Sequence, residues 1–459
     1  MDSLTLVEKT SNWIKTSIVL KLLGIGILIL VLLIPMSMLR SLIAERSALQ
    51  EQAIDEISSK WGGEQTLSGP VLTIPYSVIL RKTSTGDTIR ETRYAHFLPE
   101  ELKIDGTLIP QSRYRGIYKA ILYEADLAVS GTYTFPRLDP AQIGAETVHY
   151  DRAFLQVGIP DMRGIQRNVT VNWNDDQYTA LPGIPTDDIT QTGIHVPVIL
   201  SGIDKTSMIP FSFNLDINGS RRLSFVPVGK KTEVSVQSTW DSPSFDGTFL
   251  PQRHSISGKG FTASWQVLDF NRNFPQSWLG SGMNLGAAQC GVSMLTPVAH
   301  YQMVTRSVKY AALIIFLTFL LFFMVELMKK YKVHPVQYLL IGTGLVLFYT
   351  LLLSLSEQLA FPVAYCAAAG ATTLLLSAYS FTIVRNALHV IMVGVLFSIL
   401  YGFLYIILRS EDYALLIGSS GLFMLLGTVM FLTRNIDWYR LGRDRGPTAE
   451  NAAGIAFEE

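Results

Sequence analysis

Long apolar runs occur in two parts of the 459-residue chain, one near the N-terminus and the others in the last third. The first run covers residues 18–39, about the length that a helix needs to cross ~30 Å of hydrocarbon. Further runs follow at 310–328, 336–355, 359–383, 387–408 and 412–432. The pattern predicts a polytopic α-helical membrane protein with six spans.

A cleaved signal peptide is the alternative for the first run. The apolar core of a signal peptide usually stops after about 7–15 residues and ends at a small-x-small cleavage site. Here the run is longer, and only Leu42-x-Ala44 resembles such a site. We therefore expect residues 18–39 to be an uncleaved membrane anchor helix.

The segment between the first and second runs has a different pattern. Residues 43–60 keep apolar positions at roughly helical spacing, which predicts a stalk helix that ends at Trp61-Gly62-Gly63. From 64 to 305, short alternating runs such as 71–74 and 232–236 are separated by clusters of Gly, Pro, Asn and Asp. Period two with these breaks predicts a large all-β or mainly β domain, folded as an antiparallel sandwich or a barrel-like structure.

A weak internal similarity leaves open that this domain holds two similar modules. The segment 102–133 resembles 234–263 in the order of its alternating pairs, prolines and glycines. The spacing agrees only within a few residues, and β sequences resemble one another by composition alone. Duplication and chance both remain as interpretations.

The distribution of Lys and Arg predicts the orientation in the membrane. Basic residues gather in the turns at 329–332, at Arg385 and at 434–445, whereas the turns near Glu357 and at 409–412 contain few. By the positive-inside rule, both termini are cytoplasmic. The predicted parts are a cytoplasmic N-terminus (1–17), a periplasmic β-rich domain (64–305), a five-helix membrane bundle (310–432) and a cytoplasmic tail (433–459). A bacterial inner membrane is the expected setting.

Composition agrees with a membrane protein and argues against other classes. The mean hydropathy is +0.30 and only 16% of the residues are charged. Because 37 basic residues balance 37 acidic ones, the total charge predicts no nucleic-acid partner. Cys290 and Cys366 lack the spacing of a zinc or redox pair, and we expect both to be free thiols.

The chain carries none of the common local signatures of an enzyme. P-loop, HExxH, GxSxG and SxxK patterns are absent, and the seven histidines are scattered without metal-ligand spacing. We predict a protein that is not an enzyme, with no catalytic, cofactor-binding or metal residues. The motif Gly418-Ser419-Ser420-Gly421 resembles the GxSG of rhomboid proteases, but no histidine follows it. Close helix packing at Gly418, Gly421, Gly394 and Gly402 is the simpler interpretation.

Ionisable residues inside predicted spans are candidates for function because they cost about 2.5–3.5 kcal/mol at mid-bilayer. For Glu326, an ion pair with Lys329 or Lys330 at helical spacing is the simpler account. Two polar patches fall on the same predicted exterior side, where the basic residues Arg306 and Lys309 arrive nearby. The candidate functional positions are Ser354, Ser356, Glu357, Glu411, Asp412 and Tyr413. The alternative is a solvated Glu357 and an Asp412 that caps the last span.

Several motifs in the chain resemble those of one family. They are Val157-Gly158-Ile159-Pro160-Asp161-Met162-Arg163, Pro243-Ser244-Phe245-Asp246-Gly247, Tyr401-Gly402-Phe403-Leu404-Tyr405, Glu411-Asp412-Tyr413 and Thr433-Arg434-Asn435-Ile436-Asp437-Trp438-Tyr439. The chain is similar throughout its length to the CreD family of inner-membrane, or cell envelope integrity, proteins. The resemblance implies control by a two-component system and a role in envelope stress, and it carries over no site residue.

Three functions are compatible with these observations. The leading hypothesis is a non-enzymatic scaffold or stress-response factor, surrounded by membrane lipids, whose periplasmic domain binds an unidentified envelope protein, lipid or glycan. The alternative is a transporter or lipid-handling protein that uses the helical bundle. A periplasmic hydrolase would need a nucleophile and a base brought together by the fold.

Overall fold

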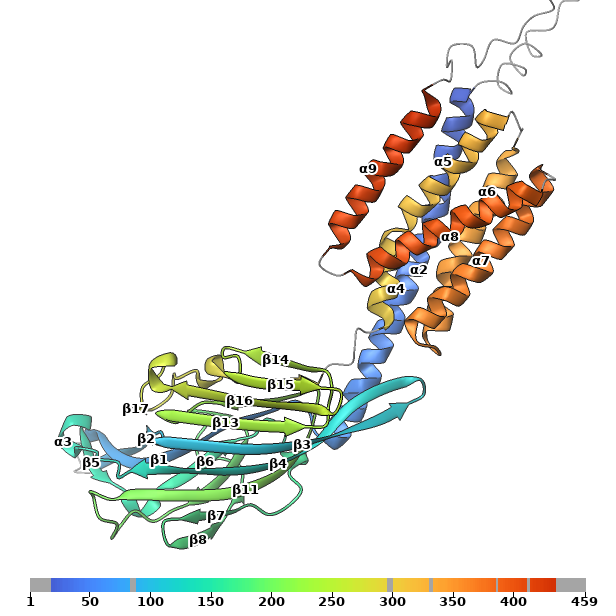
Figure 1. Cartoon of the computed structure of the whole chain (residues 1–459). Helices are drawn as coiled ribbons and strands as arrows, with labels where there is room; N and C mark the ends of the chain where they lie inside the picture. Colours follow the sequence, from blue (N-terminus) through green and yellow to red (C-terminus); the bar gives the residue numbers. More distant parts are fainter. Residues whose placement is uncertain are drawn as a thin grey trace, which may run out of the picture. The chain divides into compact units, whose positions relative to one another are not determined.

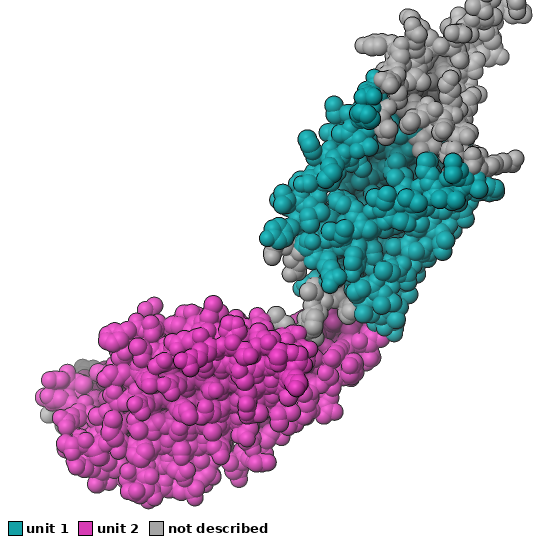
Figure 2. All heavy atoms as spheres, in the orientation of Figure 1, with its two compact units in different colours: residues 1–48, 299–459 teal, residues 49–298 magenta. Residues whose placement is uncertain are grey.

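The computed structural model describes residues 18–82, 88–294, 300–329, 333–384, 387–410 and 413–434. The chain divides into two compact units, one formed by residues 1–48 and 299–459 and the other by residues 49–298 (Figure 2). We call them the helical unit and the β unit, after the elements that dominate each (Figure 1).

The helical unit contains the apolar helices expected from the hydropathy pattern. Its helices are α2 (Ile18–Trp61), whose residues from 49 onward belong to the β unit, α4 (His300–Lys309), α5 (Ala311–Lys329), α6 (Pro335–Ser356), α7 (Phe361–Val384), α8 (Ala387–Arg409) and α9 (Ala414–Thr433). Among the described residues, α2, α6, α7, α8 and α9 are each long and apolar enough to cross a membrane. Helices α4 and α5 meet this criterion only together, with a bend of 44° between them. Six spans stay a prediction, and α4 is a helix that the sequence analysis did not foresee.

The predicted anchor and stalk are parts of one helix. Helix α2 continues for 44 residues, includes Pro35, and changes from an apolar to a polar composition along its length. It ends at Trp61 because Gly62 follows with a φ of +152°, where an added Cβ would lie 2.5 Å from the carbonyl oxygen of Asn218. The indole Nε1 of Trp61 donates a hydrogen bond of 3.2 Å to the carbonyl oxygen of Tyr123, which joins this end of α2 to the strands.

The β unit is built from two sheets. The ten-stranded sheet contains β1 (Gln65–Lys82), β2 (Thr88–Phe97), β5 (Ala145–Val148), β6 (Phe154–Gly158), β9 (Leu181–Pro182), β10 (Gly193–Pro197), β12 (Arg222–Val226), β14 (Pro243–Gly247), β17 (Ser277–Leu279) and β18 (Cys290–Met294). The eight-stranded sheet has the order β15 (Arg253–Ser257), β16 (Gly260–Leu268), β13 (Lys231–Ser238), β3 (Glu101–Arg115), β4 (Tyr118–Thr134), β11 (Met208–Ser220), β7 (Thr170–Trp173) and β8 (Asp176–Thr179). Short helical turns connect some of them: α3 (Pro140–Ile143), η1 (Tyr150–Arg152), η2 (Met162–Gly164), η3 (Asp269–Asn271) and η4 (Leu285–Ala288).

The mainly β domain is as predicted, but its sheets are not purely antiparallel. Strand β1 pairs with β12 in parallel, and β3 pairs with β13 in parallel. Parallel neighbours need a long crossover between them, and here more than a hundred residues separate the paired strands. The two segments with weak internal similarity, 102–133 and 234–263, begin in the parallel strands β3 and β13. Ile104 of β3 is in register with Val234 of β13.

Alternation of polar and apolar residues along the strands produces the core of the β unit. In β3, the odd positions from Glu101 to Asp105 are exposed while Leu102 and Ile104 are buried. The largest fully buried side chains of the unit are Trp173, Trp265, Tyr123, Tyr133 and Phe225. Each large apolar side chain that is removed from water contributes about 1.5–3 kcal/mol to folding. The other face of the same strands is left to polar residues.

Candidate functional site

Glu357 joins three helices of the helical unit. Its carboxylate, at the C-terminal end of α6, accepts a hydrogen bond of 3.0 Å from the hydroxyl of Tyr301 on α4. The Nε of Arg46 on α2 lies 3.9 Å from the same oxygen. The Glu357 side chain is 18% exposed, so its charge is partly shielded from water. These contacts connect α2, α4 and α6.

The two serines near Glu357 differ in environment. Ser354 is exposed, whereas Ser356 is buried and its hydroxyl donates a hydrogen bond of 2.9 Å to the carbonyl oxygen of Leu353. Such a bond to the preceding turn is common for serine in a helix. Ser356 thus bonds within its own helix, and the contacts with other helices described above are made by Glu357.

The second predicted patch is only partly described. Glu411 and Asp412 lie outside the described residues. Tyr413 is the residue that precedes α9, and it is 65% exposed. A meeting of this patch with residues 354–357, and their approach to Arg306 and Lys309, stay predictions.

A second polar cluster in the helical unit was missed by sequence reasoning. Glu326 on α5 is only 6% exposed and forms an ion pair with Lys21 on α2. The hydroxyl of Tyr338 on α6 donates a hydrogen bond of 3.1 Å to the other carboxylate oxygen of Glu326. A buried charge in an apolar helix needs such partners, because leaving it unpaired is costly. The side chains of Lys329 and Lys330, the expected partners, lie outside those described.

Aromatic rings pack between α6, α7 and α8. The ring of Phe348 lies 4.5 Å from that of Tyr401 and 5.7 Å from that of Tyr365, measured between centroids. The Tyr365 hydroxyl donates a hydrogen bond of 2.7 Å to the carbonyl oxygen of Tyr401. Phe348 and Tyr349 are fully buried. This part of the bundle is filled by side chains.

The small-residue motif of the last helix takes part in helix packing at one position. An added Cβ at Gly421 would lie 2.2 Å from the ring of Phe403 on α8, so this glycine permits close approach. Gly418 and Gly402, expected to do the same, have no described neighbouring atom within 4 Å of an added Cβ. That part of the packing prediction is wrong, because a small residue promotes contact only where a neighbour faces it.

The β unit contains one histidine with the partners of a catalytic base. The ring of His96 lies between the Thr73 hydroxyl, 3.0 Å from Nδ1, and the Asp188 carboxylate, 3.1 Å from Nε2. Thr73 and His96 are cross-strand neighbours, and both are 0% exposed. Burial lowers the pKa of His96, against the opposing effect of Asp188. A hydroxyl that no substrate reaches cannot act as a nucleophile, so these groups hold β1 and β2 together.

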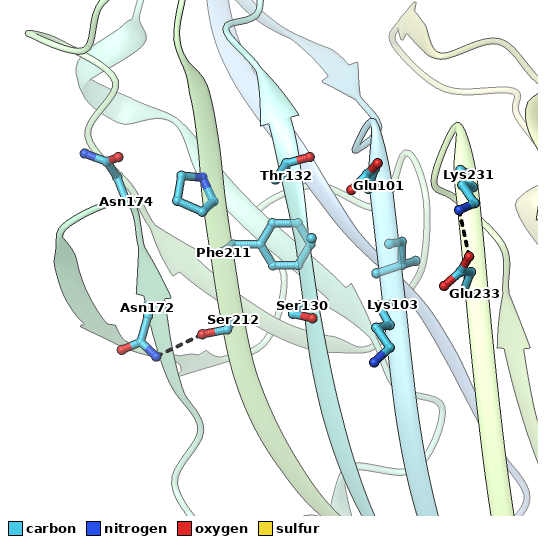
Figure 3. A pocket seen from close by; sticks show the side chains of 13 residues that line it. Glu101, Lys103, Ser130, Thr132, Asn172, Asn174, Phe211, Ser212, Lys231 and Glu233 are labelled. Carbon is cyan, nitrogen blue, oxygen red and sulfur yellow. Dashed lines mark hydrogen bonds and ion pairs between the residues drawn. The ribbon is translucent and has the colours of Figure 1, made fainter.

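A pair of rows made mostly of polar residues lies on the outer face of the eight-stranded sheet (Figure 3). The first row runs across five strands through Glu233, Lys103, Ser130, Ser212 and Asn172, each in register with the next. The second row contains Lys231, Glu101, Thr132 and Pro210 in register, followed by Asn174, whose backbone N–H donates to the carbonyl oxygen of Pro210 at 2.8 Å. We call this surface the two-row groove.

The two-row groove has a volume of about 440 Å³, within the ~300–1,000 Å³ of typical ligand sites. Its floor lies between the rows, where Gly131 has no side chain. An added Cβ there would meet the carbonyl oxygen of Glu101 at 2.1 Å and the ring of Phe211 at 2.7 Å. An added Cβ would point to the same side as the buried Phe211, so glycine at this position leaves room for that ring beneath the two rows.

Charges in the groove are balanced, and its amides and hydroxyls are partly engaged. Lys231 forms an ion pair of 2.7 Å with Glu233, whose carboxylate raises the pKa of the lysine. Asn172 donates a hydrogen bond of 3.0 Å to the hydroxyl of Ser212, as the dashed line in Figure 3 shows. The hydroxyl of Thr132 is buried without a hydrogen-bond partner among the described residues. The groove offers donors and acceptors without an excess of either charge.

The described residues also limit metal chemistry. Within the parts of the chain that the structure describes, no three His, Cys, Asp or Glu side chains form a group that could hold a metal ion. Most of the row residues occupy ordinary polar positions of strands, and the sequence analysis proposed none of them as a site residue. Their alignment depends on strand register, which only the three-dimensional pairing defines.

Comparison with known proteins assigns the chain to a family. The family described as Inner membrane protein CreD matches residues 17–439. The Inner membrane protein CreD of Escherichia coli (strain K12) is 33% identical over 416 residues, which cover 90% of this chain and 91% of that protein. A mutant M1 zinc metallopeptidase from Deinococcus radiodurans covers 47% of this chain and 54% of its own at 9% identity and a TM-score of 0.19, too low to support a fold argument. The chain belongs to the CreD family of inner membrane proteins.

Proposed function

We propose that this protein is a non-enzymatic envelope-integrity factor, whose β unit faces the periplasm and binds an envelope glycan through the two-row groove. The observation that carries the proposal is the alignment of ten groove residues in two rows across five strands. The helical unit anchors this domain in the inner membrane. If the full-length protein does not bind sacculi, envelope protein or lipid partners become the candidates in place of a glycan.

The chemistry of the groove favours a neutral polyhydroxy ligand. Two lysines and two glutamates cancel, so the groove selects neither an anion nor a cation. Amide and hydroxyl groups can both donate and accept, as sugar hydroxyls and acetamido groups require. Five strands at about 4.8 Å spacing extend over roughly 19 Å, which suits a polymer rather than one sugar ring. A protein partner would instead favour an apolar centre with a polar rim.

Two observations support a role without catalysis. The histidine with a threonine and an aspartate beside it is buried, so its hydroxyl cannot meet a substrate. The bundle interior around Phe348 is packed with aromatic rings, which suits an anchor better than a conduit. Both agree with a protein that binds and holds.

The test uses the full-length protein in detergent with isolated peptidoglycan sacculi. In Ser130→Trp, a large side chain enters the groove, and we expect co-sedimentation with sacculi to weaken by about tenfold or more. Asp126→Trp is the matched control, because Asp126 is an exposed residue of the same strand and face, four residues away. Equal binding of the wild type and Ser130→Trp, or no binding by the wild type, would contradict the proposal.

The proposed orientation has its own test. It rests on the basic turns at 329–332 and 434–445 and on the few basic residues near Glu357. A fluorescent protein fused after residue 459 should fluoresce, and alkaline phosphatase inserted between residues 258 and 259 should be active. The reverse pattern would place the β unit in the cytoplasm.

One observation favours transport or lipid handling as a second candidate function. An open groove of about 550 Å³ lies between α7 and α8, lined by apolar residues together with Thr373, Ser377, Gly394 and Ser398. The Ser377 hydroxyl is buried without a partner among the described residues. If Gly394→Leu abolished complementation of a deletion strain while Ser130→Trp did not, this second function would replace the first.

A further inference from the structure

The β3–β4 hairpin projects beyond the sheet to which it belongs. Strand β13 pairs with β3 only up to Leu108, and β11 pairs with β4 only from Leu122 onward. Residues 112–121 therefore pair only with one another, and we call residues 109–119, which include the tip of this ribbon, the arm. It turns at Gly116, whose φ of +59° suits the first position of a two-residue hairpin loop. In Figure 1 the arm, in cyan, extends past the neighbouring strands near the last turns of α2.

The composition of the arm differs from that of the polar rows. Its sequence, IPQSRYRGIYK, contains Arg113, Arg115 and Lys119 and no acidic residue. Ile109, Tyr114 and Ile117 are 53%, 66% and 44% exposed. Basic, aromatic and aliphatic side chains together are typical of segments at a membrane interface, where cations meet phosphates and amphipathic rings lie at headgroup level.

Two contacts with α2 hold the arm and give its direction. The guanidinium of Arg113 lies over the ring of Trp61, 5.6 Å from its centroid. Arg115, two residues nearer the tip, forms an ion pair with Glu56. The arm therefore follows α2 from Trp61 toward Glu56. An isolated two-stranded hairpin is only marginally stable, so these contacts matter for its order.

We propose that the arm docks on the headgroup layer of a bilayer that contains anionic lipids. Arg113 and Lys119 bind lipid phosphates, Arg115 keeps its ion pair with Glu56, and Tyr114 and Ile117 enter the interface between headgroups and acyl chains. The surface and the ligand differ from those of the two-row groove, so this inference is independent of glycan binding. The complementary charge of anionic lipids argues for them over a neutral surface.

The experiment measures the depth of the arm tip in the full-length protein. Ile117→Cys carries a spin label in a Cys366→Ala background. Cys290 stays unlabelled because it is 0% exposed and burial raises the pKa of its thiol to about 12. The protein is reconstituted into vesicles of phosphatidylcholine with phosphatidylglycerol or of phosphatidylcholine alone. Accessibility to oxygen and to a water-soluble nickel chelate is then compared. The matched control is a label at Lys259, in the exposed turn of the β15–β16 hairpin.

In the anionic vesicles, we expect the label at 117 to be more accessible to oxygen than to the nickel chelate. The control label at 259 should remain accessible to the nickel chelate. Arg113→Gln with Lys119→Gln should shift the label at 117 toward water, while Arg115 keeps its pair with Glu56. Equal nickel accessibility at 117 and 259 in anionic vesicles would overturn the proposal. So would equal shielding of the label in both vesicle types, which would indicate a protein contact.

Discussion

The Glu357 carboxylate accepts a hydrogen bond of 3.0 Å from the hydroxyl of Tyr301, a residue 56 positions earlier in the chain. The bond holds the end of α6 against α4, the helix that precedes the bent junction with α5. Arg46 of α2 approaches the same carboxylate at 3.9 Å, a long distance for an ion pair. We therefore attribute the contact mainly to the hydrogen bond.

Two replacements of Glu357 distinguish the contribution of its contact with Tyr301 from that of its contact with Arg46. In Glu357→Gln the amide oxygen still accepts from Tyr301, so only the attraction to Arg46 is lost, about 0–1 kcal/mol for a partly exposed pair. Glu357→Leu loses both and should cost about 1–3 kcal/mol. Thermal unfolding of the purified protein in detergent measures the difference. If Glu357→Gln abolished complementation without lowering the melting temperature, the carboxylate would have a transport role.

The ion pair of the buried Glu326 with the partly exposed Lys21 predicts a compensating double variant. Lys21→Glu places two carboxylates together, and Glu326→Lys places two ammonium groups together, so each should reduce the amount of monodisperse protein. The double reversal restores opposite charges and should recover much of the loss. Size-exclusion chromatography of fluorescent fusions gives the yield. Lys21→Arg keeps the charge and serves as the control, and an unrecovered double variant would contradict a direct pairing.

Buried His96 predicts a pH dependence of stability in the β unit. Burial lowers the pKa of the folded histidine below its ordinary value of 6.5, although Asp188 opposes the shift. Below about pH 6.5 the unfolded chain takes up a proton that the folded chain does not. The free energy of unfolding should therefore decrease as the pH is lowered, by at most about 1.4 kcal/mol per pH unit, until the pH reaches the pKa of the folded histidine.

Denaturant unfolding of the β unit in the full-length protein at several pH values between about 5 and 8 measures this slope. His96→Gln should flatten the slope, whereas the exposed His254→Gln should leave it unchanged. The same slope in His96→Gln as in the wild type would assign the pH dependence to other groups.

Gly131 predicts a strong effect of one added methyl group. In Gly131→Ala the new carbon would meet the Glu101 carbonyl and the Phe211 ring, so the strands must shift at a cost of about 1–3 kcal/mol. Gly258→Ala is the control because an added Cβ at that position has no neighbour within 4 Å. Thermal unfolding followed by circular dichroism compares the two. Equal melting temperatures for both variants would show that the sheet accommodates the methyl group.

The main elements of the fold follow from local patterns in the sequence. Apolar runs long enough to span a bilayer stand out against alternating strands, and the predicted helix ends lie within a few residues of the observed ones for α6, α8 and α9. Helix α4 was missed because its ten residues form a short amphipathic segment next to a long apolar one. Local patterns report the period of a segment, not its partner.

The pairings between distant segments could not be predicted. Lys21 and Glu326 are 305 residues apart, and their ion pair depends on the packing of α2 against α5. Likewise, Lys103 joins a row with Ser130 and Glu233 only because β3 lies between β4 and β13. Among the predicted site residues, Glu357 is the one for which contacts with other helices are given above. Its partners, Tyr301 and Arg46, lie on helices far away in the sequence, so a local pattern could not identify them.

The two-row groove and the core occupy opposite faces of the same strands, so they do not respond alike to genetic change. Substitution at an exposed row position such as Lys103 or Asn172 alters the chemistry of the groove and leaves Leu102 and Trp173 in place behind it. Insertion or deletion of one residue in β4 would instead turn Ser130 inward and a core residue outward. On the proposed glycan-binding function, lineages that diverge in ligand preference should therefore differ at these positions by point substitution, while the lengths of the five strands stay constant.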